Sequence, residues 1–348
     1  MNVRGIAALL LSTALVAAGC AAPRATSATA APSGSAAASA APDFTGRSLN
    51  LVTGPTGGVY IVYGAGIADV LTKKLKVAAS AQVTPASIDN MKLLRDGKTD
   101  LALTIADIVF DAVNGKGRFA PPEGKVDAKV LAVMYTNFMH VIAKDGIGIN
   151  VMADLKGKRV SLGAAGSGTE TKGLRVLEAY GLAAADATGN LQPDPSIKRE
   201  RLGPQDSADA MRDGKLDAFF WDGGLPTGSV SDLAGSTKIK FLDETDAVAK
   251  MASKYGPFYF AGKIPKGTYK NEADINVVSV ANLLVVSSSF DPAFAGAILK
   301  TLFDNQADLV LVHPEAKNLK LETAVEGSPI DFHPGAIEFY KSRGVWKK

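Results

Sequence analysis

The feature that most restricts the fold of this chain is a pattern that occurs twice. Residues 94–103 read Leu-Arg-Asp-Gly-Lys-Thr-Asp-Leu-Ala-Leu, and residues 211–220 read Met-Arg-Asp-Gly-Lys-Leu-Asp-Ala-Phe-Phe. Each copy predicts the end of a helix, a glycine in a left-handed cap and then a buried strand. Upstream of each copy, at about the same spacing, a strand leads through a glycine-rich loop into a helix (51–58 and 160–169). Two such repeats in the same order predict two lobes of similar plan.

Short apolar strands alternate with helical segments through both copies, which is typical of an α/β fold with largely parallel sheets. In the first copy we expect strands at 49–53 and 101–105, a strand ending at 83, and helices at 58–75 and 87–96. In the second copy, the strand and loop at 160–169 are followed by a helix.

Two longer apolar stretches, 130–144 and 277–287, flank the second copy and are predicted to cross between the lobes. A helix from Asp291-Pro292 to about 312 and a short one from Pro334 to 344 follow. The prediction is a two-lobed α/β protein with a hinged cleft, with lobe 1 at 46–140 and 276–348 and lobe 2 at 141–275.

The first residues predict the compartment. A short positive start precedes an apolar run, 6–18, that is too short for an ordinary transmembrane helix and has the plan of a secretory signal. Residues 15–20 resemble a bacterial lipobox, so we expect a signal peptide at 1–19 and a lipid on Cys20. The alternative is a signal cleaved elsewhere, with Cys20 incidental. Residues 20–45, rich in Ala, Ser and Pro, predict a flexible tether that holds an extracytoplasmic protein to the membrane.

Composition argues against several classes of function. A net charge of +3 with mixed signs and no basic tract does not favour nucleic acid as a partner. One cysteine and three scattered histidines offer neither a disulfide framework nor a metal site, and no cofactor motif is complete. No nucleophile–base pair is visible, so we expect a binding protein without catalytic residues.

Ligands of open α/β sheets bind where strands end and helices begin, and helix N-termini receive anions. The loops 54–58 and 163–169 should therefore face each other across the cleft and hold a small anion. The candidate ligand-binding residues lie in these loops or beside equivalent strand and helix ends: Thr56, Gly58, Tyr60, Ser87, Asn90, Asp107, Ser167, Gly168, Thr169, Trp221, Asp222 and Gly223. For Ser87 and Asn90 the alternative is helix capping; for Tyr60 and Trp221 it is core packing.

The chain resembles the TAXI family of TRAP-transporter solute receptors from about 49 to 344. The resemblance is carried by short motifs in order: Thr53–Tyr60, Ser87–Asn90, Ala106-Asp107, Asp154–Val160, Gly166–Glu170, Phe219-Phe220 with Gly223–Thr227, Ile264–Tyr269 and His333–Ala336. It implies a type II periplasmic-binding fold, small carboxylate ligands such as glutamate or 2-oxoglutarate, and delivery to a TRAP membrane subunit driven by an ion gradient. One position departs from the family: Ile105 stands where members often carry Gln.

The expected ligand is refined by a charge argument. The cleft loops hold no Lys or Arg, whereas Asp107, Glu170 and Asp222 lie near the proposed anion seat. The ammonium of a glutamate-like amino acid could meet Asp222 or Asp107, so an amino acid is favoured over a dicarboxylic acid. A receptor for an ABC importer and an accessory that presents ligand to a membrane sensor kinase remain alternative functions.

Overall fold

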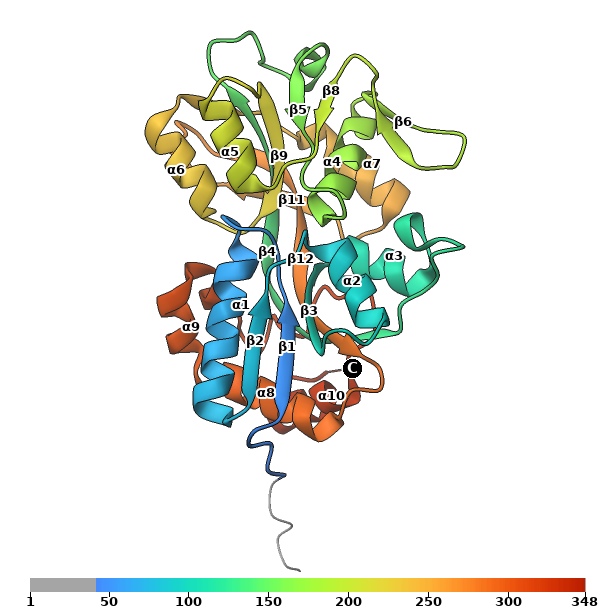
Figure 1. The fold of residues 1–348 in the computed structure, drawn as a ribbon, viewed down its shortest axis with the longest axis vertical. Helices are drawn as coiled ribbons and strands as arrows, with labels where there is room; N and C mark the ends of the chain where they lie inside the picture. The colour runs from blue at the N-terminus through green and yellow to red at the C-terminus, as the bar shows by residue number, and fades with distance from the viewer. Residues whose placement is uncertain (1–41, 348) are drawn as a thin grey trace, which may run out of the picture. The chain divides into compact units, whose positions relative to one another are not determined.

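The computed structural model describes residues 42–347 (Figure 1). The predicted signal peptide, Cys20 and residues 20–41 of the tether lie outside the described residues. Within the described range, no helix combines the length and the apolar character needed to cross a bilayer.

One mixed sheet organises the described chain. Its strands are β1 (Ser48–Val52), β2 (Ala78–Gln82), β3 (Leu101–Ile105), β4 (Ala128–Lys144), β5 (Arg159–Ser161), β8 (Lys198–Glu200), β9 (Ala218–Gly223), β10 (Ile239–Phe241), β11 (Phe260–Ile264) and β12 (Ile275–Ser287). The main path runs β2-β1-β3-β12-β4-β9-β5-β8, with β10 on β4 and β11 on β12. A separate hairpin joins β6 (Ala183–Ala185) to β7 (Leu191–Pro193).

The strand order repeats itself about the two long strands. On one side β1 pairs in parallel with β2 and β3, and on the other β5 pairs in parallel with β8 and β9. The antiparallel strands β12 and β4 lie between the two groups and pair with β3 and β9 respectively. The internal repeat read from the sequence therefore corresponds to two strand groups of the same order.

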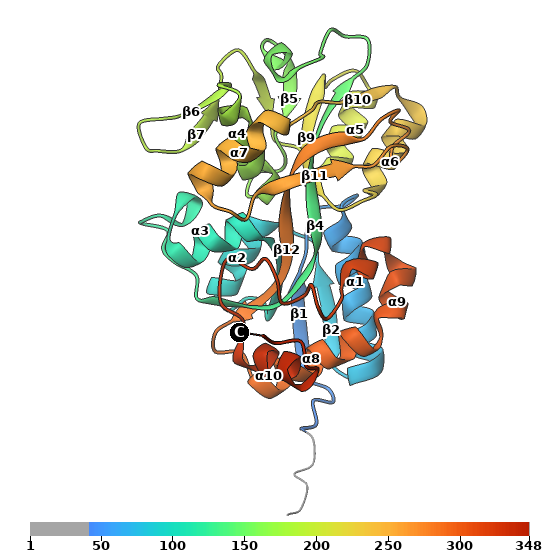
Figure 2. The ribbon, with the colours of Figure 1, turned by 180° about the vertical axis from the view of Figure 1, so that it is seen from behind.

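Helices flank both groups of strands. They are α1 (Val59–Val70), α2 (Ser87–Arg95), α3 (Ala106–Asn114), α4 (Gly168–Ala179), α5 (Pro204–Arg212), α6 (Gly228–Ser236), α7 (Thr245–Tyr255), α8 (Pro292–Asp304), α9 (Gln306–Val312) and α10 (Pro334–Ser342), with short turns η1 (Leu71–Leu75), η2 (Gly117–Phe119), η3 (Met152–Leu155) and η4 (Pro314–Asn318). Around β1–β3, α1 and α9 lie on one side and α2 and α3 on the other; around β9, α5 and α6 lie opposite α4 and α7 (Figures 1 and 2).

The long strands β4 and β12 run through both groups and form much of the core. Alternate and, in stretches, consecutive side chains along them are fully buried, which explains why their sequences are apolar on both faces. The α/β class with two like halves is confirmed. The predicted lobe boundaries at 140/141 and 275/276 fall inside β4 and at the first residue of β12, and they stay predictions.

Two helix predictions need correction. The helix expected from 291 to 312 is broken at Asn305, whose backbone and side-chain amide both donate to the carbonyl of Thr301 and so end α8. Its predicted start is right, because Asp291 caps the backbone amides of Ala293 and Phe294. Ser87 is the first residue of α2 and makes no side-chain cap, since Ala86 occupies the N-cap position.

Candidate ligand-binding site

A small cavity lies where the ends of β3 and β9 meet the starts of α1, α2 and α4. Its volume is about 20 Å³, which holds about one water molecule. Nine of the twelve predicted site residues line it: Gly58, Tyr60, Ser87, Ser167, Gly168, Thr169, Trp221, Asp222 and Gly223. The two repeated loops therefore do face each other, and a ligand of amino-acid size would require these walls to move apart.

Three predicted residues lie outside the cavity lining. Thr56 is exposed on the loop before α1. Asn90 is fully buried, and its side-chain amide donates to the carbonyls of Thr53 and Leu103 at 2.6 and 2.8 Å. Asn90 therefore ties the ends of β1 and β3 together behind the loops. Asp107 is also fully buried and points away, toward Arg175 and Tyr259.

The starts of α1 and α4 each approach the other half of the molecule closely, because the contact position in each is a glycine. A Cβ on Gly168 would lie 2.4 Å from Cδ1 of Ile105, at the end of β3, and 3.0 Å from Oγ of Ser87, at the start of α2. A Cβ on Gly58 would lie 2.8 Å from the indole of Trp221. These two glycines let the start of each helix contact the other half directly.

Ser167 and Thr169 hold the start of α4 in place. The Ser167 hydroxyl accepts from the amide of Glu170 at 3.1 Å and donates to the carbonyl of Ala164 at 2.6 Å, which makes it a helix cap. Thr169 Oγ1 accepts from the amide of Asp222 at 3.3 Å and so links α4 to the end of β9. The Trp221 indole donates to Thr227 Oγ1 at 2.8 Å.

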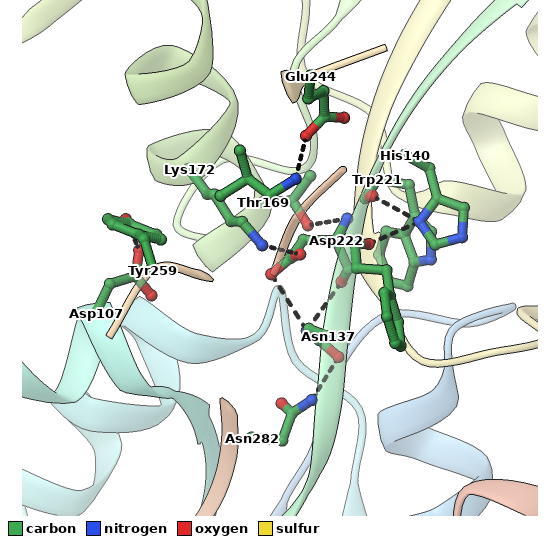
Figure 3. Close-up of polar contacts among 12 residues, drawn as sticks. Asp107, Asn137, His140, Thr169, Lys172, Trp221, Asp222, Glu244, Tyr259 and Asn282 are labelled. Carbon is green, nitrogen blue, oxygen red and sulfur yellow. Dashed lines mark hydrogen bonds and ion pairs between the residues drawn. The ribbon is translucent and has the colours of Figure 1, made fainter. Parts of the chain in front are cut away.

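A chain of buried polar side chains forms the floor of the cavity (Figure 3). The Tyr60 hydroxyl donates to Asn282, whose amide donates to Asn137. The Asn137 amide contacts the carbonyl and the carboxylate of Asp222, both at 3.2 Å. This chain connects α1, β12, β4 and β9, so the two long strands carry polar groups from one half of the molecule to the other.

Asp222 already has a cationic partner. Nζ of Lys172, one turn into α4, donates to its carboxylate at 2.7 Å, and both side chains are almost completely buried. Burial raises the pKa of Asp222, although the Lys172 charge opposes the shift. Glu244 lies nearby, fully buried, and accepts from the amide of Val278 at 2.8 Å. Burial raises the pKa of Glu244 well above its ordinary value, and the ion pair that Lys172 forms is with Asp222.

The other two acids of the charge argument are also paired. Asp107 accepts from the Tyr259 hydroxyl at 2.5 Å and from Arg175 at 3.3 Å. Glu170 pairs with Arg199 and with Arg201. The premise that these acids are free to meet a ligand ammonium is therefore wrong. The pairing could not be predicted from the loop sequences, because the basic partners lie on α4, on β8 and just after β8.

The three histidines serve the fold. His140 is fully buried; its Nδ1 lies 2.7 Å from the Phe138 carbonyl and Nε2 lies 3.1 Å from the Tyr269 hydroxyl. Burial lowers its pKa to about 4. His313 and His333 cap η4 and α10 through their ring nitrogens. Across residues 42–347, no group of three His, Cys, Asp or Glu side chains could hold a metal ion.

Several residues at this site were not predicted: Tyr135, Asn137, Lys172, Glu244 and Asn282. A signal for two of them exists in the sequence, because Asn137 and Asn282 each interrupt a long apolar strand, where a buried amide needs partners. Lys172 lies three residues after Thr169, on the same face of a helix. Ile105, where the TAXI resemblance expects Gln, lines the cavity and presents an apolar side chain to it.

The repeated strand order, the two long crossing strands and the cavity at the strand ends define a mixed α/β protein of the type II periplasmic-binding plan. The chain belongs to the NMT1-like family, whose model matches residues 51–344.

Solved structures with similarity to the chain include three binding proteins. The periplasmic aliphatic sulphonate binding protein SsuA from Escherichia coli is 16% identical with a TM-score of 0.45, over 86% of this chain and 84% of that one. The alkanesulfonate-binding protein SsuA from Xanthomonas axonopodis pv. citri is 15% identical with a TM-score of 0.46, over 86% and 91%. A binding protein component of an ABC phosphonate transporter from Pseudomonas aeruginosa is 12% identical with a TM-score of 0.47, over 78% and 79%. These scores are low, and the fold assignment rests on the strand order instead.

Proposed function

We propose that this protein is an extracytoplasmic solute-binding protein that captures a small carboxylate in the cavity between its two like halves. The observation that carries the proposal is the set of walls around that cavity. The starts of α1, α2 and α4 all line it, and helix N-termini attract anions. Because Lys172 neutralises Asp222, no free carboxylate of the cavity floor repels the ligand.

The cavity walls alone indicate a small anion, and the family resemblance narrows the class of ligand further. The TAXI resemblance supports glutamate, glutamine or 2-oxoglutarate-like acids. Since Asp222 is already paired, the proposal no longer requires an ammonium on the ligand. Keto acids and amino acids are therefore equal candidates. Separate titrations of the wild-type protein with glutamate and with 2-oxoglutarate would show which of the two binds more tightly.

The partner is proposed to be a TRAP-type membrane subunit, on the strength of the same resemblance. Transport reconstituted with that subunit should depend on an ion gradient and proceed without ATP. Dependence on ATP hydrolysis would instead identify the receptor of an ABC importer. A lipid on Cys20 would keep the receptor close to its transporter, because acyl chains contribute about 0.8 kcal/mol per buried CH₂.

The test of the site compares two threonines by titration calorimetry with glutamate, glutamine and 2-oxoglutarate. Thr169→Ala should weaken the bound acid by about 1.5–3 kcal/mol, because hydrogen bonds to charged groups are worth about that much. Thr56→Ala is the matched control, since Thr56 is exposed and outside the cavity. Equal affinity in the two variants would place the ligand elsewhere.

A further inference from the structure

A second and larger cavity lies beside the first. Its volume is about 370 Å³, within the size range of small-molecule sites. Its walls come from α3 and η2 on one side and from α4, β7 and β8 on the other, with the end of α7. The two cavities share no lining residue: Thr169 lines the first and Glu170 the second, so the first turn of α4 separates them.

The lining of this second cavity is strongly basic. Six of its side chains are basic and three are acidic, an excess of three positive charges. Two of the basic groups have their own partners, since Lys254 pairs with Glu178 at 2.7 Å and Arg175 pairs with Asp111. The positive excess therefore belongs to the remaining four groups.

Two arginines of this cavity share a single carboxylate, and a third arginine lines the opposite wall. Arg199 and Arg201 both contact Oε1 of Glu170, the latter at 2.7 Å. Nε of Arg199 is buried and has no hydrogen-bond partner within the described chain. Arg118, on η2, lines the same cavity from the opposite side and forms no ion pair with any described residue. The positive charges of Arg201 and Arg118 add to the effect of burial in lowering the pKa of Arg199.

Such an arrangement is suited to an anion with several acceptor oxygens. Each guanidinium presents a planar fork that matches the oxygens of a phosphate or carboxylate. An oxyanion between Arg118 and the Arg199–Arg201 pair would offset the mutual repulsion of the three cations. Lys116, which lies over the ring of Phe110 at 5.0 Å, adds a further positive charge at the same wall.

We propose that this second cavity is a separate binding site for a small oxyanion that carries two or more negative charges. The site does not depend on the identity of the solute in the first cavity. Because Arg118 belongs to η2 and Arg201 follows β8, a bound anion would contact both halves of the molecule and hold them together.

The test titrates inorganic phosphate and, separately, citrate into the purified full chain by calorimetry, at constant ionic strength set with sodium chloride. Binding to the wild-type protein is expected for both probes, together with a rise in its melting temperature. Arg118→Gln and Arg201→Gln should each weaken binding at least tenfold. Both side chains are substantially exposed, so these variants are expected to fold.

Lys198→Gln is the matched control. It removes the same charge from β8, but Lys198 is exposed and does not line the cavity. It should bind both probes as the wild type does, and so should Thr169→Ala in the first cavity. The proposal is overturned if neither probe binds beyond the chloride background, or if Lys198→Gln loses as much affinity as Arg118→Gln. A loss in Thr169→Ala equal to that in Arg118→Gln would also overturn it, because the anion would then occupy the first cavity.

Discussion

At the scale of single residues, the site depends on a buried ion pair. Lys172 and Asp222 are 0% and 1% exposed, and their charged groups are 2.7 Å apart. A buried pair of this kind adds little net stability, but loss of one partner leaves an uncompensated charge in the interior. The net stability that the pair adds is therefore smaller than the stability that is lost when one partner is removed.

Lys172→Met should lower the free energy of unfolding by about 3–5 kcal/mol, because Asp222 would be left charged or forced to take up a proton. The double variant Lys172→Met/Asp222→Asn should recover more than half of that loss. Lys73→Met is the control: it disrupts a pair with Asp69 at a similar distance of 2.8 Å, but on the surface, and should change stability little. Urea denaturation measures all three variants. A small effect of Lys172→Met would mean that the buried pair is not formed.

The residues that sequence reasoning missed share one property. Lys172, Asn137 and Asn282 lie within regular helices and strands, where the spacing of the surrounding apolar residues predicts a packed core. Their polar role depends on which strands become neighbours, and sheet pairing between β4, β9 and β12 is not local in sequence. The loop residues, by contrast, were found because glycine-rich loops before helices are a local signal.

At the scale of elements, the two repeated loops position the site. Each strand–loop–helix unit brings a helix start to the cavity, and a glycine at that start contacts the other half of the molecule. The repeat could be predicted because the same pattern of residues occurs at two places in the sequence. The bounds of β3 agree with the prediction. The break at Asn305 was not predicted, because it depends on one side-chain amide that donates to the carbonyl of Thr301 and so ends the helix.

Gly168→Ala tests this contact between elements. The new methyl group would meet Ile105 at the end of β3 and Ser87 at the start of α2, so the two halves could not approach as closely around a ligand. We expect a loss of about 1–3 kcal/mol in solute binding, the usual cost of overpacking. Gly228→Ala is the control, because Gly228 is also the first residue of a helix but its Cβ would meet nothing closer than 3.9 Å. If calorimetry gives equal affinities for the two variants, the loops do not close on the solute.

At the scale of the whole molecule, the lipid anchor and the folded chain are separate predictions. Cys20 lies outside the described residues, so the anchor rests on the sequence pattern at 15–20. Cys20→Ala should move the protein from the membrane fraction to the soluble or secreted fraction when cells are fractionated. Membrane association that is unchanged in this variant would contradict the lipoprotein prediction.

The central claim is that a small carboxylate binds in the cavity between the two like halves. Trp221 lines that cavity, and the only other tryptophan is Trp346, which packs on Phe332 and Tyr340. In Trp346→Phe, the remaining tryptophan fluorescence reports on the cavity alone. Titration with glutamate and 2-oxoglutarate should give, for at least one of them, a saturable change whose dissociation constant equals the calorimetric value. Calorimetric binding without any change in Trp221 fluorescence would contradict the account, and so would the absence of binding by both acids.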